Sequence, residues 1–285
     1  MIGNPHPKEL TQGTIFTCAL AEEYPGIPVL GIIITARCDV SHGKAPIFSY
    51  VPLVKFEDWL LQDGRRVLAG RCMAAARATM KAAVVEAKLT PSILETVSHA
   101  AISAELGKSA DKGGLATAKR FDEALVVLSK AESAIMDVVS VDESKKFISD
   151  NQKTYNQMAS EVLSGLMSDF YYIDRSEIGE QCLGYVALLR EIRSVPALLA
   201  RALLTGIDVS QFVDLCCKHS TLENKLAITS NDHYAMPVGL MLSPFIEHFM
   251  QRLTHLFSRI GVTDFPPEKL KGLRAMVPFA LDKEI

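Results

Sequence analysis

The sequence predicts an α+β protein: a small, strongly bent antiparallel β-sheet, an inserted helical bundle and a C-terminal helix. Strand-forming residues dominate up to about residue 57, a helical texture follows, and strand patterns return near residue 169. Three strands alone make a poor isolated domain. We therefore expect residues 8–57 and 169–285 to form one β-domain with the C-terminal helix, and residues 58–168 to form a helical insertion. The alternative is two small β-domains on either side of a helical one.

Three strands are predicted in the first region. Residues 13–18 are largely β-branched or aromatic, residues 29–36 form a nearly continuous apolar run, and residues 47–54 form the third strand. The apolar run is typical of a strand covered on both faces or at the centre of a small barrel. Pro52 predicts that the third strand lies at a sheet edge or ends there, because proline donates no ladder hydrogen bond.

Four helices are predicted between the two β-regions, as in a bundle. The first, 66–87, is rich in Ala, Met, Arg and Lys. The second starts with Thr90 as its N-cap, followed by a proline in the first turn. The third, 115–139, has apolar residues at three-to-four spacing, and the fourth covers 144–167.

Strand patterns return after the bundle. Residues 170–174 and 184–192 have such patterns, although the end of the second segment is also compatible with a helix. Residues 226–230 and 234–239 are predicted to pair as a hairpin around an Asn-Asp turn. A final helix starts near Ser243, which is followed by a proline and an acidic residue. Its expected buried stripe and end are Phe245, Phe249, Leu253, Leu256 and Gly261.

The composition excludes several classes of protein. Hydrophobic residues make up 48% of the 285-residue chain, too many for a disordered polyampholyte. The 30 Lys and Arg against 33 Asp and Glu give a net charge of −3, which argues against a strongly basic nucleic-acid coat.

No apolar run reaches the roughly 18 residues of a membrane span, and the N-terminus lacks a secretory signal pattern. The six cysteines contain no C-x-x-C pair, so we expect a reduced cytoplasmic protein without a zinc site.

Five short motifs resemble the SH3-like barrels of the MazF/PemK toxin family. Residues 12–16 (Gln-Gly-Thr-Ile-Phe) and 31–35 (Gly-Ile-Ile-Ile-Thr) resemble its first two strands, and residues 50–53 (Tyr-Val-Pro-Leu) its third. Residues 184–194 resemble its strand with a Gln-Ile-Arg-Ser-like segment, and residues 238–243 its Val-Gly-x-Leu segment before the C-terminal helix. The resemblance implies an SH3-like barrel and a toxin-like, growth-control or antiviral defence setting. It leaves the helical region unexplained.

The chain departs from that family at the residues that cleave RNA. The family uses an Arg just before the second strand and a Ser or Thr after the third. Here residues 25–29 contain no Arg, and residues 51–54 contain no Ser or Thr. The family's ribonuclease residues therefore do not carry over.

The most unusual polar cluster follows the most hydrophobic predicted strand and comprises Arg37, Cys38, Asp39 and His42. A guanidinium, a thiol, a carboxylate and an imidazole at this spacing could bind phosphate and exchange protons, and a nearby cation could lower the pKa of the thiol. These four are the candidate catalytic residues. In the structural alternative, Cys38 is a buried strand-end residue, Asp39 caps the turn and Arg37 pairs with Asp39.

Other polar features also have simple structural explanations. Asp232 and His233 lie in the predicted hairpin turn, and His248 and His255 are too far apart in sequence for the usual i, i+4 metal pair. A basic face on the first bundle helix could contact nucleic-acid phosphates or an acidic partner, or simply face solvent. Its side chains are Arg65, Arg66, Arg71, Arg77, Lys81 and Lys88. The chain has no phosphate-binding loop or dinucleotide fingerprint, and no cofactor or metal is expected.

These observations leave three functions open, and they do not determine whether the chain is an enzyme. The first is a cytoplasmic prokaryotic binding or accessory protein that contacts nucleic acid or a protein partner, in a setting implied by the resemblance alone. The second is a nuclease similar to an endoribonuclease, centred on the four candidate catalytic residues. The third is a scaffold that forms a homo-oligomer through its bundle. No membrane partner is expected.

Overall fold

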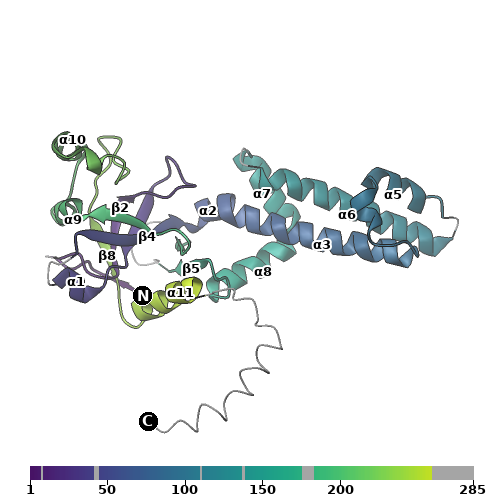
Figure 1. The fold of residues 1–285 in the computed structure, drawn as a ribbon, viewed down its shortest axis with the longest axis horizontal. Coiled ribbons are helices and arrows are strands. Elements are labelled where there is room, and N and C mark those ends of the chain that lie inside the picture. Colours follow the sequence, from purple (N-terminus) through teal and green to yellow (C-terminus); the bar gives the residue numbers. More distant parts are fainter. Residues whose placement is uncertain (8, 42–44, 110, 137–138, 175–182, 259–285) are drawn as a thin grey trace, which may run out of the picture.

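The computed structural model describes residues 1–258 except 8, 42–44, 110, 137–138 and 175–182. It is an α+β protein in which an antiparallel sheet curls into a half-barrel at one end and a long helical arm projects from it (Figure 1). The strand order is β1-β8-β2-β3-β4-β6-β5, and β7 also pairs with β4. The strands are β1 (Ile2–Gly3), β2 (Thr14–Ala19), β3 (Val29–Ile33), β4 (Ile47–Lys55), β5 (Phe170–Ile173), β6 (Tyr185–Leu188), β7 (Arg193–Pro196) and β8 (Pro237–Met241).

Strands from the two predicted β-regions pair with one another in this sheet. Ile15 of β2 lies opposite Gly239 of β8, and Leu53 of β4 lies opposite Ala187 of β6. All helices from α2 to α8 lie between β4 and β5 in the chain. The α+β class predicted from the sequence is therefore confirmed, and so is the pairing between its two β-regions.

The prediction that Pro52 marks a sheet edge or a strand end was wrong. β4 pairs with β3 along one side, where Pro52 lies opposite Gly31. On its other side β4 pairs with β7 over residues 47–50 and with β6 over residues 53–55. Pro52 falls in the gap between these two partners. A residue without an N–H is tolerated there because neither β6 nor β7 needs that hydrogen bond.

The predicted hairpin of residues 226–230 and 234–239 was also wrong. β8 begins at Pro237 and pairs with β1 and β2, while residues 226–230 form no strand. The N–H of Ala227 instead donates to the carbonyl of Cys18, next to the sheet. The segment between β6 and β8 also contains elements that no sequence pattern had predicted. These are β7, α9 (Ala197–Leu203), α10 (Val209–Lys218) and the 3-10 turn η2 (Ser220–Leu222).

The helical arm is built on two long helices that lie side by side, α3 (Arg65–Glu86) and α6 (Lys112–Ile135) (Figure 1). Small side chains at their contact let the two backbones approach closely, since Ala69, Ala83 and Ala131 are fully buried. α2 (Phe56–Trp59) and a π-helical turn, η1 (Leu60–Gly64), lead from the sheet into the arm. The remaining helices of the arm are α4 (Ile93–Thr96), α5 (His99–Leu106), α7 (Val141–Asp150) and α8 (Gln152–Leu163).

Two helices predicted as continuous are each broken in two. The second helix begins as α4, but Val97 is extended, and Ser98 then caps α5 by accepting a hydrogen bond from the N–H of Ala101. Thr90 does not act as the N-cap. The fourth helix is divided at Asn151, and its first half is started by a capping box at Ser140.

Apolar side chains cover both faces of the central strands, as the run 29–36 predicted. On one face Ile32, Val51 and Leu53 share a cluster with α11 (Phe245–Phe257), and on the other face Phe16 and Tyr50 join the base of the arm. Gly31 permits the packing of these two rings, because a Cβ there would lie 2.5 Å from Phe16. The buried residues of α11 are Ile246, Phe249 and Leu253, so the stripe is shifted from Phe245, which is exposed. Gly261, the predicted end of this helix, lies outside the described residues.

None of the helices in the described part of the chain is both long enough and apolar enough to cross a bilayer.

Candidate functional site

Three of the four predicted catalytic residues lie together on a one-turn helix directly after β3. This helix, α1 (Arg37–Ser41), carries Arg37, Cys38 and Asp39, and all three side chains are exposed. The thiol of Cys38 lies 3.8 Å from Oδ1 of Asp39. His42 lies outside the described residues. The cluster therefore stands on the surface at the end of the strand, open to solvent.

The structural alternative for the same cluster was wrong for Cys38 and Arg37, whereas residues 42–44 of the turn that Asp39 was expected to cap lie outside the described residues. Cys38 is exposed rather than buried. Within the described chain, Arg37 forms no ion pair with Asp39, and no backbone N–H donates to the Asp39 carboxylate. The neighbouring Val40 contributes to a small, mainly apolar hollow of about 140 Å³ beside α9.

The histidines have structural surroundings where the structure gives them partners. Nδ1 of His233 lies 3.2 Å from the N–H of Thr229, inside its own loop. Nδ1 of His248 lies 3.1 Å from the hydroxyl of Tyr171, which fixes α11 against β5. No group of three or more potential metal-ligating side chains occurs among the residues that the structure describes.

The arginines of the predicted basic face are paired within the protein. Arg66 binds Glu23, Arg71 binds Glu161 and Arg77 approaches Glu132. Arg65 is fully buried and donates to the backbone carbonyls of Leu61, Ala134 and Met136. These guanidinium groups consequently serve the folding of the arm, and they offer little uncompensated charge to nucleic-acid phosphates.

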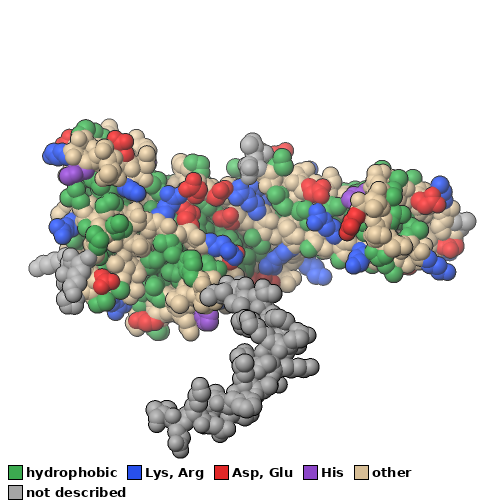
Figure 2. Space-filling view, viewed as in Figure 1, with side chains coloured by type: hydrophobic (Ala, Val, Ile, Leu, Met, Phe, Trp, Pro, Cys, Tyr) green, Lys and Arg blue, Asp and Glu red, His purple; other side chains and the backbone are tan. Residues whose placement is uncertain are grey.

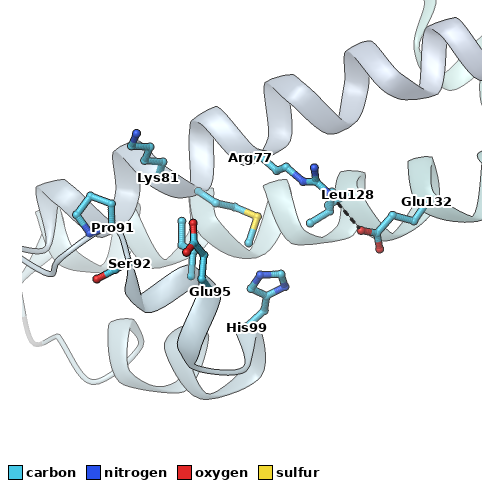
Figure 3. A pocket seen from close by; sticks show the side chains of 10 residues that line it. Arg77, Lys81, Pro91, Ser92, Glu95, His99, Leu128 and Glu132 are labelled. Atoms are coloured by element: carbon cyan, nitrogen blue, oxygen red, sulfur yellow. Dashed lines mark ion pairs between the residues drawn. The ribbon is translucent and has the colours of Figure 1, made fainter.

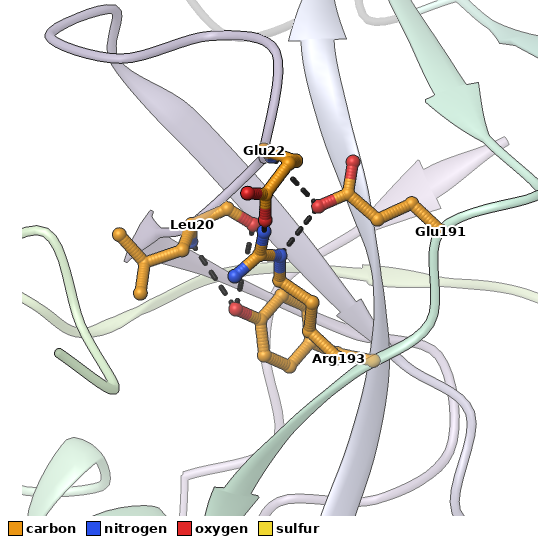
Figure 4. Close-up of polar contacts among 5 residues, drawn as sticks. Leu20, Glu22, Glu191 and Arg193 are labelled. Atoms are coloured by element: carbon orange, nitrogen blue, oxygen red, sulfur yellow. Dashed lines mark hydrogen bonds and ion pairs between the residues drawn. The ribbon is translucent and has the colours of Figure 1, made fainter.

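The polar motif in residues 184–194 is likewise used for structure. Arg193 of β7 binds the carboxylates of Glu191 and Glu22, and the carboxylate of Glu191 also accepts from the N–H of Glu22 (Figure 4). Burial by itself would lower the pKa of Arg193, but the two carboxylates raise it above its usual range. The hydroxyl of Tyr50, whose pKa is raised by burial, completes the group by accepting from the N–H of Leu20. This network ties the loop after β2 to the sheet.

A cavity of about 610 Å³, within the usual size range of small-molecule sites, lies on the arm where the α4–α5 segment meets α3 and α6 (Figure 3). Its apolar surface includes the buried side chains of Met80 and Leu128. Arg77 and Glu132 stand on one side of it, with 3.9 Å between their closest charged atoms. Across from them, Glu95 and His99 rise from the α4–α5 segment toward α3, and Lys81 stands one helical turn beyond Arg77.

No sequence motif had indicated this cavity. Arg77 and Lys81 belong to the predicted basic helix face, but Glu95 and His99 belong to no motif. Their convergence depends on the break between α4 and α5, which turns the chain back over α3. The spacing of Arg77 and Lys81 on one face was the available signal.

Comparisons of the chain with protein-family models, with curated proteins and with solved structures found no match.

Proposed function

We propose that this protein is a non-catalytic accessory protein that binds a protein partner through its helical arm. The observation that carries the proposal is the contrast between the charged and the apolar side chains of the arm. Four of its arginines pair with acidic residues of the protein and the fifth, Arg65, binds backbone carbonyls, whereas many of its large apolar side chains face solvent. Such a surface favours a protein partner over a nucleic acid.

Apolar exposure on the arm is spread over several helices. The arm projects from the sheet and so presents these side chains to an approaching molecule (Figure 2). The side chains that are more than half exposed are Val85, Leu115, Val126, Met136, Val141, Leu163 and Leu166.

We further propose that the curled sheet is an SH3-like barrel and that the arm is an insertion into it. The ends of the arm support this arrangement. The rings of Phe56 and Tyr172 lie 6.3 Å apart, and those of Trp59 and Phe170 lie 5.2 Å apart. The chain thus leaves the sheet and returns to it at nearly the same place, as an insertion requires. The toxin-like or antiviral-defence setting rests on the family resemblance.

The nuclease hypothesis is less well supported by the geometry. Arg37, Cys38 and Asp39 stand on a helical turn where all three side chains are exposed to solvent. A catalytic group works best when its surroundings hold it in place and shield the reacting atoms. The cluster is therefore a surface feature, and its activity can be tested directly.

Site-specific photo-crosslinking in the source cells tests the proposed binding. A photoreactive side chain is placed at Val126 on α6 and, as a matched control, at the equally exposed Val213 on α10. We expect a discrete protease-sensitive, nuclease-resistant adduct from position 126 and none from position 213. An adduct that nuclease removes, or the lack of any adduct from Val126, Val85 and Leu115, would overturn the proposal.

A cleavage assay tests the nuclease hypothesis separately. The wild-type chain is incubated with mixed RNA and DNA, with and without divalent metal, beside Asp39→Ala and Asp39→Asn. We expect no cleavage by any of the three, and melting temperatures that agree, because the Asp39 side chain is exposed. Cleavage by the wild type that disappears in both variants while the fold persists would establish the nuclease instead.

A further inference from the structure

We infer that the arm cavity binds a zwitterionic molecule with an apolar side chain, namely a free amino acid or a short peptide. This inference concerns a small-molecule site and is independent of the proposed binding of a protein partner. It stands on three features: how the cavity forms, which of its charged groups lack partners, and how the charges are arranged around its apolar surface.

The cavity exists because α4 does not pack tightly. Ile93 and Leu94 of α4 are only partly buried against the apolar cluster of the arm, whereas the adjoining α5 buries Ile102 and Leu106 fully in it. The extended Val97 between the two helices sets α4 apart from the three-helix core. A space of about 610 Å³ thereby remains under α4, with Met80 and Leu128 as its buried apolar surface.

The polar groups around the cavity are less satisfied than those elsewhere on the arm. The side chains of Lys81, Glu95 and His99 form no hydrogen bond or ion pair with any described residue. Those of Arg66, Arg71 and Arg120 are paired with carboxylates. The ion pair of Arg77 with Glu132 is long, 3.9 Å, and both side chains are more than half exposed. A ligand could replace this weak contact at small cost.

The arrangement of charge selects the class of ligand. Arg77 and Lys81 are four residues apart on α3 and both line the cavity, with the Lys81 side chain extending away from Arg77 (Figure 3). Glu95 and Glu132 bring two negative charges to the same cavity from α4 and α6. A purely anionic ligand would meet the two carboxylates, and a purely cationic one would meet the two cations.

A zwitterion satisfies both sets. Its carboxylate would bind Lys81, its ammonium would bind Glu95, and its apolar side chain would lie against the half-buried Pro91 and Leu94. His99 also lines the cavity, and its ring can donate to or accept from an amide of the ligand. The volume accommodates a dipeptide as well as a single amino acid.

Calorimetric titration of the full chain with Leu-Leu and with leucine tests the inference and distinguishes the two ligand sizes. We expect saturable binding of at least one of them. Lys81→Met and Glu95→Gln should each weaken it about tenfold, as the loss of one charge-assisted hydrogen bond implies. Lys145→Met and Glu123→Gln, which change exposed charges outside the cavity, should leave the affinity unchanged.

Capped peptides test which side chain binds each charged end of the ligand. Leu-Leu amide, which lacks the carboxylate, should bind weakly and be insensitive to Lys81→Met. N-acetyl-Leu-Leu, which lacks the ammonium, should bind weakly and be insensitive to Glu95→Gln. The inference is overturned if neither leucine nor Leu-Leu binds up to about 10 mM, near the weak limit of specific affinity. It is equally overturned if the capped peptides bind as well as Leu-Leu, or if both cavity variants bind like the wild type.

Discussion

The phenol of Tyr24 donates a 2.7 Å hydrogen bond to Oδ2 of Asp63, and this contact joins the loop after β2 to the π-helical turn at the base of the arm. Two further bonds act beside it, since Arg66 pairs with Glu23 and the amide of Gln62 donates to the Glu23 carbonyl. The same loop is bound to the sheet through the pair of Glu22 with Arg193. It is therefore fastened to both parts of the molecule and helps to set the direction in which the arm projects.

Replacing the phenol tests how much this contact stabilises the protein. Tyr24→Phe leaves the half-buried carboxylate of Asp63 without its donor and should lower the free energy of unfolding by about 1–3 kcal/mol. Tyr155→Phe is the control, because no described residue hydrogen-bonds the hydroxyl of Tyr155. Urea denaturation of both variants measures the difference. Equal stability of the two would show that the contact contributes nothing.

The stability should also depend on pH through Asp63. Burial raises the pKa of this carboxyl, and the hydrogen bond from Tyr24 and the charge of Arg66 offset the shift only in part. A group whose pKa is higher in the folded state contributes stability that is complete below its unfolded pKa, about 3.9 for Asp, and is lost as the pH rises through the folded value. Asp63→Asn does not ionise and keeps an oxygen acceptor for Tyr24.

We therefore expect Asp63→Asn to gain stability relative to the wild type as the pH rises from about 4, and the gain to level off once Asp63 is fully ionised. Free energies of unfolding between about pH 4 and pH 8 for both proteins provide the measurement. A difference that stays constant over this range, or that falls with rising pH, contradicts the expected burial effect.

The buried guanidinium of Arg65 should not be replaceable by an ammonium. Its Nε donates to the carbonyl of Leu61 at 3.0 Å and its Nη1 donates to that of Met136 at 3.2 Å, which fixes the end of α6 against the start of α3. A lysine lacks this planar fork, so Arg65→Lys leaves buried carbonyls unpaired. Each unpaired carbonyl should lower the free energy of unfolding by about 1–3 kcal/mol. Arg120→Lys, in an exposed pair with Glu86, should change the stability little. Thermal and urea unfolding of the two variants can be compared directly.

The close approach of α3 and α6 should make the arm intolerant of larger side chains at their contact. Ala131 is fully buried, so Ala131→Leu forces the helices apart and should cost about 1–3 kcal/mol. The matched change Ala116→Leu lies at an exposed position of the same helix and should stay within about 0.5 kcal/mol of the wild type. If both substitutions are equally harmless, the helices are less tightly packed than the structure indicates.

Local sequence patterns determined the change from strands to helices and back to strands along the chain, but not the elements between β6 and β8. The apolar run that contains β3 predicted a strand covered on both faces, because a continuous run of β-branched and aliphatic side chains has no polar face to present to water. The helical texture of α3 and α6 reflects backbone preferences that act over a few residues. The final helix was predicted near its observed start, but Ser243 is not its N-cap, because α11 begins at Phe245 after Pro244. The position of Arg37, Cys38 and Asp39 at the end of a strand followed from the same local reasoning.

Contacts between residues far apart in the sequence decided the rest. β8 pairs with β2 across more than 200 residues instead of forming a local hairpin, and the change of partner from β7 to β6 accommodates Pro52 inside the sheet. Three arginines of the predicted basic face form ion pairs within the protein because α6, α8 and the loop after β2 supply the acids. The arm cavity arises where α4 only partly buries its side chains over α3. Burial, pairing and cavities are properties of the packed molecule, and a one-dimensional pattern carries only the residue types from which they are made.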